Sequence, residues 1–120
     1  MKEIAVGNRY ALAIYEIAKE LNRVEDMYKE LKIVMETYEL NIDFKNFINH
    51  PLVKKDDKKE FISKVFSKEV SGETMNLLHY LIDKTRLAQI KAIVTEYLKL
   101  YYERNQIVEA QATFAVEPTK

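Results

Sequence analysis

Residues 8–22 read Asn-Arg-Tyr-Ala-Leu-Ala-Ile-Tyr-Glu-Ile-Ala-Lys-Glu-Leu-Asn and carry the strongest helical signal in the chain. On a helix, the charged positions of this stretch form one narrow stripe, and the other positions are apolar nearly all the way round. A helix that covers a single core needs an apolar arc of only about 100°. The stretch therefore predicts a helix that either lies centrally in a bundle or is apolar on a second face.

Five more segments show helical patterns, in which apolar residues recur at spacings of three and four. These segments are residues 24–38, 43–49, 57–66, 71–83 and 86–105. Segment 71–83 shares the wide apolar arc of the first helix. The expected N-caps are Asp43, Asp57, Ser71 and, for the last helix, Thr85. Because only two glycines and two prolines interrupt the chain, we predict an all-α protein built as a six-helix bundle.

The apolar period changes from helical to two after residue 105. Apolar side chains from Val108 to Val116 alternate with polar ones up to Pro118, which predicts a strand. A lone strand has nothing to pair with. We therefore expect a helical bundle domain at residues 1–105, and a strand or linker at residues 106–120 that leads to a missing C-terminal domain.

Composition excludes several classes of protein. The 120 residues suffice for one hydrophobic core, and 19 basic residues balance 19 acidic ones, whereas proteins that bind nucleic acid usually have a basic excess. The absence of cysteine excludes disulfides and thiolate metal sites. No apolar run approaches the ~20 residues that span a bilayer, and the charged N-terminus does not resemble a secretory signal. We expect a soluble, cytoplasmic protein that meets a membrane only through a partner.

No motif for catalysis, cofactor binding or metal binding is present. The chain lacks the clustered glycines of a phosphate-binding loop, and its two histidines, His50 and His79, are far apart in sequence. We expect His50 to cap carbonyls or face solvent, and His79 to be solvated. The basic run at residues 54–59 includes Asp56 and Asp57 and precedes Glu60, so it is expected to be a solvated turn.

Four segments, in the right order and at the right spacing, together resemble one known family over almost the whole chain. They are residues 9–18 (Arg-Tyr-Ala-Leu-Ala-Ile-Tyr-Glu-Ile-Ala), residues 47–51 (Phe-Ile-Asn-His-Pro) followed by 58–62, residues 76–87, and residues 108–115. The family comprises the delta subunits of bacterial rotary ATP synthases and their mitochondrial counterpart, the oligomycin-sensitivity-conferring protein. The family often has a glycine at the position of Thr85, just before the arginine of the turn between the fifth and sixth helices.

The resemblance implies a non-catalytic stator subunit in the peripheral stalk of a proton-translocating ATP synthase, on the cytoplasmic face of the membrane. In the family, a groove between the first and fifth helices binds the N-terminal helix of the alpha subunit, and the C-terminal domain attaches to the b-subunit stalk. These are the same two helices that have wide apolar arcs here. The candidate partner-binding residues are Tyr10, Ala13, Ile14 and Ile17 on the first helix and Asn76, Tyr80, Asp83 and Lys84 on the fifth.

Two other functions are compatible with a small helical bundle. A helical RNA-binding factor of the transcription-antitermination type would need a basic face and a salt-dependent affinity for RNA. A small enzyme would need ionisable groups of displaced pKa in a pocket between helices. The balanced charge and the terminal alternating segment weigh against the RNA-binding factor, and the sequence offers no set of residues for the enzyme.

Overall fold

A computed structural model describes residues 2–105, with side chains described for residues 5–104. The elements are α1 (Lys2–Glu20), α2 (Val24–Leu40), α3 (Ile42–Asn49), α4 (Lys55–Phe66), α5 (Gly72–Asp83), the short 3-10 turn η1 (Leu87–Gln89) and α6 (Ile90–Asn105). The all-α, six-helix prediction is thus confirmed over the described residues. The strand or linker predicted at residues 106–120 lies outside them.

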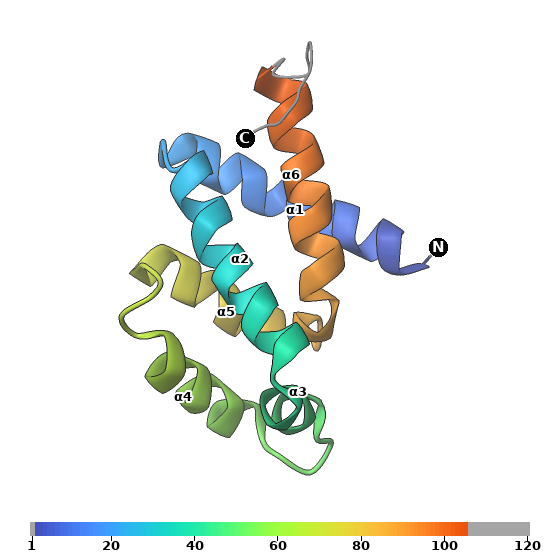
Figure 1. Cartoon of the computed structure of the whole chain (residues 1–120), viewed down its shortest axis with the longest axis vertical. Coiled ribbons are helices and arrows are strands. Elements are labelled where there is room, and N and C mark those ends of the chain that lie inside the picture. The colour runs from blue at the N-terminus through green and yellow to red at the C-terminus, as the bar shows by residue number, and fades with distance from the viewer. Residues whose placement is uncertain (1, 106–120) are drawn as a thin grey trace.

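The helices form two groups (Figure 1). In one group α6 crosses α1 and packs along α2, and in the other α4 packs against α5. The short helix α3 follows α2 at the end of the molecule away from the last turn of α6. One hydrophobic core, to which all six helices contribute side chains, runs through both groups.

The crossing of α1 and α6 depends on small residues. Gly7, Ala11 and Ala18 are all buried on the face of α1 that meets α6. A Cβ atom placed on Gly7 would lie 2.8 Å from the backbone carbonyl carbon of Ala92 in α6, so only glycine permits this approach. The predicted helix start at residue 8 is wrong, because Gly7 lies inside α1. There the backbone of α6 occupies the space that a side chain would fill.

Tyr97 joins α6 to the rest of the core. Its side chain is fully buried, and its hydroxyl donates a hydrogen bond to the carbonyl oxygen of Val24 at 2.7 Å. Its ring meets that of Tyr15 edge-on, with 5.5 Å between centroids, and stacks on that of Tyr28 at 6.4 Å. Burial raises the pKa of the Tyr97 phenol. The buried hydroxyl stabilises the core because it has a hydrogen-bond acceptor, the carbonyl oxygen of the first residue of α2.

Two of the turns after helices use left-handed residues. Asn22 and Thr85 have φ angles of 59° and 57°. In each turn the next residue closes the helix end: the N–H of Arg23 donates to the carbonyl of Ala18 at 2.9 Å, and that of Arg86 to the carbonyl of Leu81 at 2.8 Å. Thr85 therefore ends α5, and the prediction that it caps the last helix is wrong. The family's frequent glycine at this position fits the left-handed backbone.

The other predicted caps have mixed outcomes. Ser71 is confirmed, because its Oγ accepts a hydrogen bond from the N–H of Thr74 at 3.3 Å. Asn41 caps α3 in place of Asp43, through a 3.0 Å hydrogen bond from the N–H of Phe44 to its Oδ1. The capping role predicted for Asp57 is wrong, since α4 already begins at Lys55 and has no side-chain cap.

Replacing Gly7 by alanine should destabilise the protein by about 1–3 kcal/mol, because the new methyl group would overlap the backbone of α6. The higher helix propensity of alanine offsets only about 1 kcal/mol of this cost. Gly72→Ala is the matched control, because a Cβ atom there would meet nothing within 4 Å. Urea unfolding followed by circular dichroism measures both changes. Equal stabilities of the two variants would contradict the close crossing.

Candidate partner-binding surface

An apolar strip follows the side of α1 that faces α5. Tyr10, Ala13 and Ile17, together with Leu21 just after the helix, recur on this side at helical spacing. We refer to them, with Asn76, Leu77, Tyr80 and Lys84 of α5, as the α1–α5 surface. The two helices meet at this surface through Tyr10 and Tyr80, whose ring centroids lie 6.3 Å apart with an angle of 58° between the rings.

The side chains of this surface are uncovered to different degrees. Ile17 is 41% exposed and Tyr80 47%, which is high for large apolar side chains. Ala13 and Asn76 are also exposed, whereas Tyr10 is half-buried beneath them. Because four of the predicted partner-binding residues thus reach solvent on one side of the molecule, the surface could take up the apolar face of another helix.

Two predicted partner-binding residues lie elsewhere. Ile14 is only 3% exposed and belongs to the core, because it falls on the side of α1 that faces the bundle interior. Asp83 is exposed, but its carboxylate lies 2.6 Å from the ammonium group of Lys59, so it is directed toward α4. That hydrogen bond holds the pKa of Asp83 below its ordinary value. The structure therefore leaves both residues out of the α1–α5 surface.

Lys84 lies at the edge of the same surface. Its ammonium group is 5.6 Å from the centroid of the Tyr80 ring, within the range of a cation–π contact. This contact keeps a positive charge beside the most exposed aromatic ring of the surface. A partner with an acidic side chain next to its apolar face would complement this arrangement.

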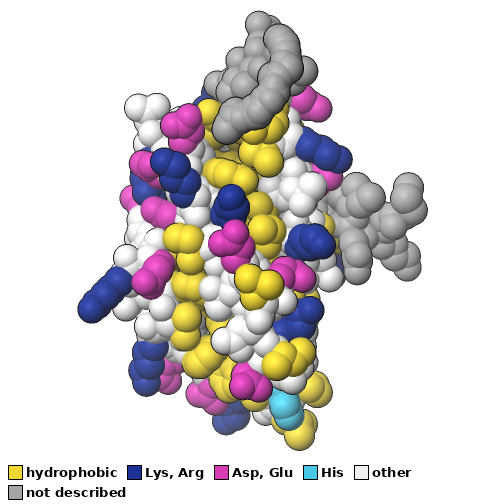
Figure 2. All heavy atoms as spheres, viewed as in Figure 1, with side chains coloured by type: hydrophobic (Ala, Val, Ile, Leu, Met, Phe, Trp, Pro, Cys, Tyr) yellow, Lys and Arg dark blue, Asp and Glu magenta, His cyan; other side chains and the backbone are white. Residues whose placement is uncertain are grey.

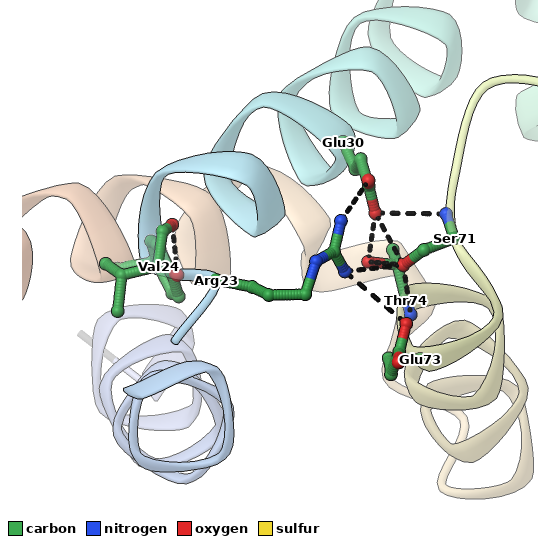
Figure 3. A network of polar contacts seen from close by, with 7 residues as sticks. Arg23, Val24, Glu30, Ser71, Glu73 and Thr74 are labelled. Carbon is green, nitrogen blue, oxygen red and sulfur yellow. Dashed lines mark hydrogen bonds and ion pairs between the residues drawn. The ribbon is translucent and has the colours of Figure 1, made fainter. Parts of the chain in front are cut away.

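A polar network fixes the start of α5 against the turn between α1 and α2 (Figure 3). Glu30 of α2 lies at its centre. One carboxylate oxygen of Glu30 accepts hydrogen bonds from the N–H of Ser71 at 3.1 Å, from the Ser71 hydroxyl at 3.0 Å and from the Thr74 hydroxyl. The other oxygen pairs with the guanidinium group of Arg23 at 2.9 Å. Arg23 also reaches Glu73 at 3.5 Å, so a single network links three segments.

The hydrogen bonds decide the charge of Glu30. Burial by itself raises the pKa of this carboxyl group, but the hydrogen bonds from Thr74, Ser71 and Arg23 outweigh burial and lower the pKa below its ordinary value. Glu30 is therefore ionised at neutral pH. No local pattern in the sequence indicates this network, because Ser71 lies 41 residues from Glu30 and 48 from Arg23.

The two histidines have local partners. The Nε2 atom of His79 lies 2.9 Å from the hydroxyl of Ser63, which joins α5 to α4, so the half-buried His79 is solvated only in part. The Nδ1 atom of exposed His50 accepts a hydrogen bond from the N–H of Leu52 at 3.1 Å. In the described part of the chain, no three His, Cys, Asp or Glu side chains are grouped as a metal site would require. None of the described helices is long and apolar enough to cross a membrane.

Charges of both signs are interspersed on the face shown in Figure 2. There, hydrophobic side chains form a band along the long axis, with basic and acidic side chains on both sides of it. An RNA-binding protein would instead need basic side chains gathered in a patch or stripe. This face therefore does not favour the RNA-binding alternative.

The fold is an all-helical bundle with an apolar strip exposed along two adjacent helices, and helix-in-groove recognition uses surfaces of this kind. The sequence pattern of one family, ATP synthase delta (OSCP) subunit, matches residues 6–120. The chain therefore belongs to the ATP synthase delta (OSCP) subunit family, and it is a non-catalytic stator subunit.

Individual relatives support this assignment. The chain is 52% identical, over its full 120 residues, to "ATP synthase subunit delta, sodium ion specific" of Ilyobacter tartaricus, and covers 68% of that protein. It is 50% identical to the protein of the same name in Propionigenium modestum, again over 120 residues and 68% of the relative. The chain is 44% identical to "ATP synthase subunit delta" of Fusobacterium nucleatum over 114 residues, which are 95% of this chain and 65% of the relative.

Replacing Glu30 by glutamine should lower the free energy of unfolding at pH 7 by about 2 kcal/mol, because Arg23 loses the nearer of its two ionic partners. The folded-state pKa of Glu30 is below its ordinary value of 4.5, so the ionised group stabilises the fold fully above that pH. This contribution is lost as the pH falls through the folded-state pKa, and the two proteins should then converge.

Urea unfolding of both proteins between pH 7 and pH 3 measures this difference. Glu36→Gln is the matched control, because Glu36 lies on the exposed side of the same helix and should have little effect. A difference between Glu30→Gln and the original protein that stays constant over the whole pH range would rule out ionisation of Glu30 as its source.

Proposed function

We propose that the α1–α5 surface binds the N-terminal helix of the ATP synthase alpha subunit and thereby holds the catalytic headpiece static against the rotor. The observation that carries this proposal is the exposed apolar strip centred on Tyr10 and Tyr80, where α1 and α5 meet. Helix-in-groove recognition uses apolar anchors at three- and four-residue spacing, and this strip presents complementary positions on two helices.

Individual residues have distinct roles in the proposed complex. Ala13, which has no side chain beyond Cβ, lets the incoming helix approach α1 closely. Ile17 and Tyr80 supply the apolar area that would be removed from water. Lys84 and Asn76, at the edge, set the register through charge and hydrogen bonding.

The polar network around Glu30 supports the same role. Binding costs less free energy when the receiving surface is already in place. Glu30 and Arg23 tie the first turn of α5 to the turn that ends α1, and the Tyr10–Tyr80 contact holds the two helices together farther along. The partner helix would thus meet two helices whose spacing is set before it binds.

In our proposal, residues 106–120 connect the helical bundle to the rest of the stator. The relatives are longer than this chain, which covers 68% of the first two. We propose that residues 1–105 are the alpha-binding domain and that residues 106–120 lead into a second domain, which attaches to the b-subunit stalk. The subunit would then lie on the cytoplasmic side and be associated with the membrane only through the complex.

We further propose that this complex translocates sodium ions. The resemblance predicted a proton-translocating enzyme, but the two relatives that are 52% and 50% identical to this chain over its 120 residues are both named sodium ion specific. ATP hydrolysis by the purified complex should rise with sodium concentration when potassium keeps the ionic strength constant. Hydrolysis that does not respond to sodium would favour protons.

Calorimetric titration with a synthetic peptide of the cognate alpha subunit's N-terminal segment tests the binding surface. We expect one-to-one binding that Tyr80→Asp and Ala13→Asp each weaken at least tenfold, roughly 1.4 kcal/mol, because each places a charge in the apolar contact. Leu12→Asp is the matched control, since Leu12 is an exposed apolar residue on another side of α1.

The outcome is interpretable only for folded variants, which circular dichroism confirms. Equal weakening by Leu12→Asp would show that the effect is not confined to the α1–α5 surface. No binding of the peptide by the original protein would overturn the proposal that the α1–α5 surface holds the alpha-subunit helix.

A further inference from the structure

A hollow lies away from the α1–α5 surface, between the α3–α4 loop, the start of α4 and the end of α5. Its volume is about 470 Å³, within the range of sites that hold small ligands or peptide side chains. Its floor is apolar and is formed by Ile48, Val53, Ile82 and Leu87. Three of these side chains belong to the buried core, so the floor is rigidly supported.

The rim of this hollow is basic. Lys54, Lys55 and Lys58 line it, and no acidic side chain does. The ammonium group of Lys55 donates a hydrogen bond to the carbonyl oxygen of Asp83 at 2.8 Å, which holds it across the end of α5. Among the described residues, Lys54 and Lys58 form no ion pair, so their charges are available to a ligand.

The helix separates charges that cancel in the sequence. Successive residues of a helix are rotated by about 100°. Asp56 and Glu60 therefore fall on the side of α4 away from Lys54 and Lys58, and Asp57 lies between the two sides. The acidic residues offset the charge of the lysines at residues 54–59 when the residues are counted, but most of them lie on a different side of α4 from Lys54 and Lys58. The predicted exposure is confirmed for residues 54–57, but the predicted turn is wrong because α4 begins at Lys55, and three of the lysines line the hollow.

We propose that this hollow is a docking site for an acidic peptide segment of another protein, which inserts one large apolar side chain between Ile48 and Leu87. The acidic residues on either side of that side chain would pair with Lys54 and Lys58. Leu52, which is 85% exposed in the adjoining loop, would cover the apolar part of the segment. The proposal uses no residue of the α1–α5 surface and so does not depend on the proposed function.

The geometry favours a peptide over an anionic membrane. A flat bilayer surface that reached Lys54 and Lys58 would also approach Asp57, which lies beside Lys54 around the helix, and its carboxylate would be repelled. A narrow peptide that enters the hollow meets only the basic side. A peptide can also place an apolar side chain on the recessed floor of the hollow. A ligand that paired only with the lysines would leave this floor unused.

Amide NMR of the whole chain tests the proposal, with a capped acidic peptide, Asp-Glu-Asp-Leu-Phe-Asp-Glu-Asp, as the probe. The signals of Val53, Ile82 and Leu87 should shift and saturate. Affinity should fall at least tenfold for the neutral peptide Asn-Gln-Asn-Leu-Phe-Asn-Gln-Asn, and should fall as salt is added. The double variant Lys54→Glu/Lys58→Glu should lose binding.

Lys64→Glu is the control, because it reverses the charge of a lysine elsewhere on α4, where Lys64 is exposed and pairs with Glu60. It should bind the acidic peptide as the original protein does. Three outcomes would overturn the proposal: shifts outside the hollow, equal binding of both peptides, or no saturable binding of the acidic one. Binding to phosphatidylglycerol vesicles that requires Lys54 and Lys58, without peptide binding, would assign the site to a membrane surface instead.

Discussion

The close approach of α1 and α6 is the constraint on which the rest of the molecule depends. It is possible because Gly7 leaves room for the backbone of Ala92. With α6 lying this close, Tyr97 can enter the core and hydrogen-bond to the first residue of α2. The same crossing decides which sides of α1 remain uncovered. One of them carries Ile17 and the half-buried Tyr10, and it stays uncovered because α6 packs on the side of Gly7.

The position of α5 depends on a different kind of interaction. The α1–α6 pair is held by apolar packing, which is strong but not directional. The start of α5 is held by Glu30, Arg23 and Ser71, whose hydrogen bonds require a defined distance and angle. A surface shared by two helices that belong to different packing groups needs such a directional link, because a change in their spacing would displace Tyr80 relative to Tyr10.

A rigid helical bundle suits the role of a stator subunit for a physical reason. A protein that transmits force between other subunits needs rigid surfaces rather than reactive groups. The described residues provide two such surfaces of different character: an apolar one along α1 and α5 and a basic-rimmed one near the start of α4. Their difference in charge and shape would allow each to select a different partner segment.

The sequence was sufficient to predict the fold class, the number of helices and which two helices have excess apolar surface, because these follow from the local spacing of apolar residues. It also indicated the family, and it identified Tyr10, Ala13, Ile17 and Tyr80, which lie together in the structure. It could not separate Ile14 from this group, because a wide apolar arc does not show where the core ends and the free surface begins. The network of Glu30, the left-handed turn at Thr85 and the lysine-rimmed hollow were decided only by the tertiary structure. Each depends on segments far apart in the chain, or on a backbone angle, that no local pattern of residues specifies.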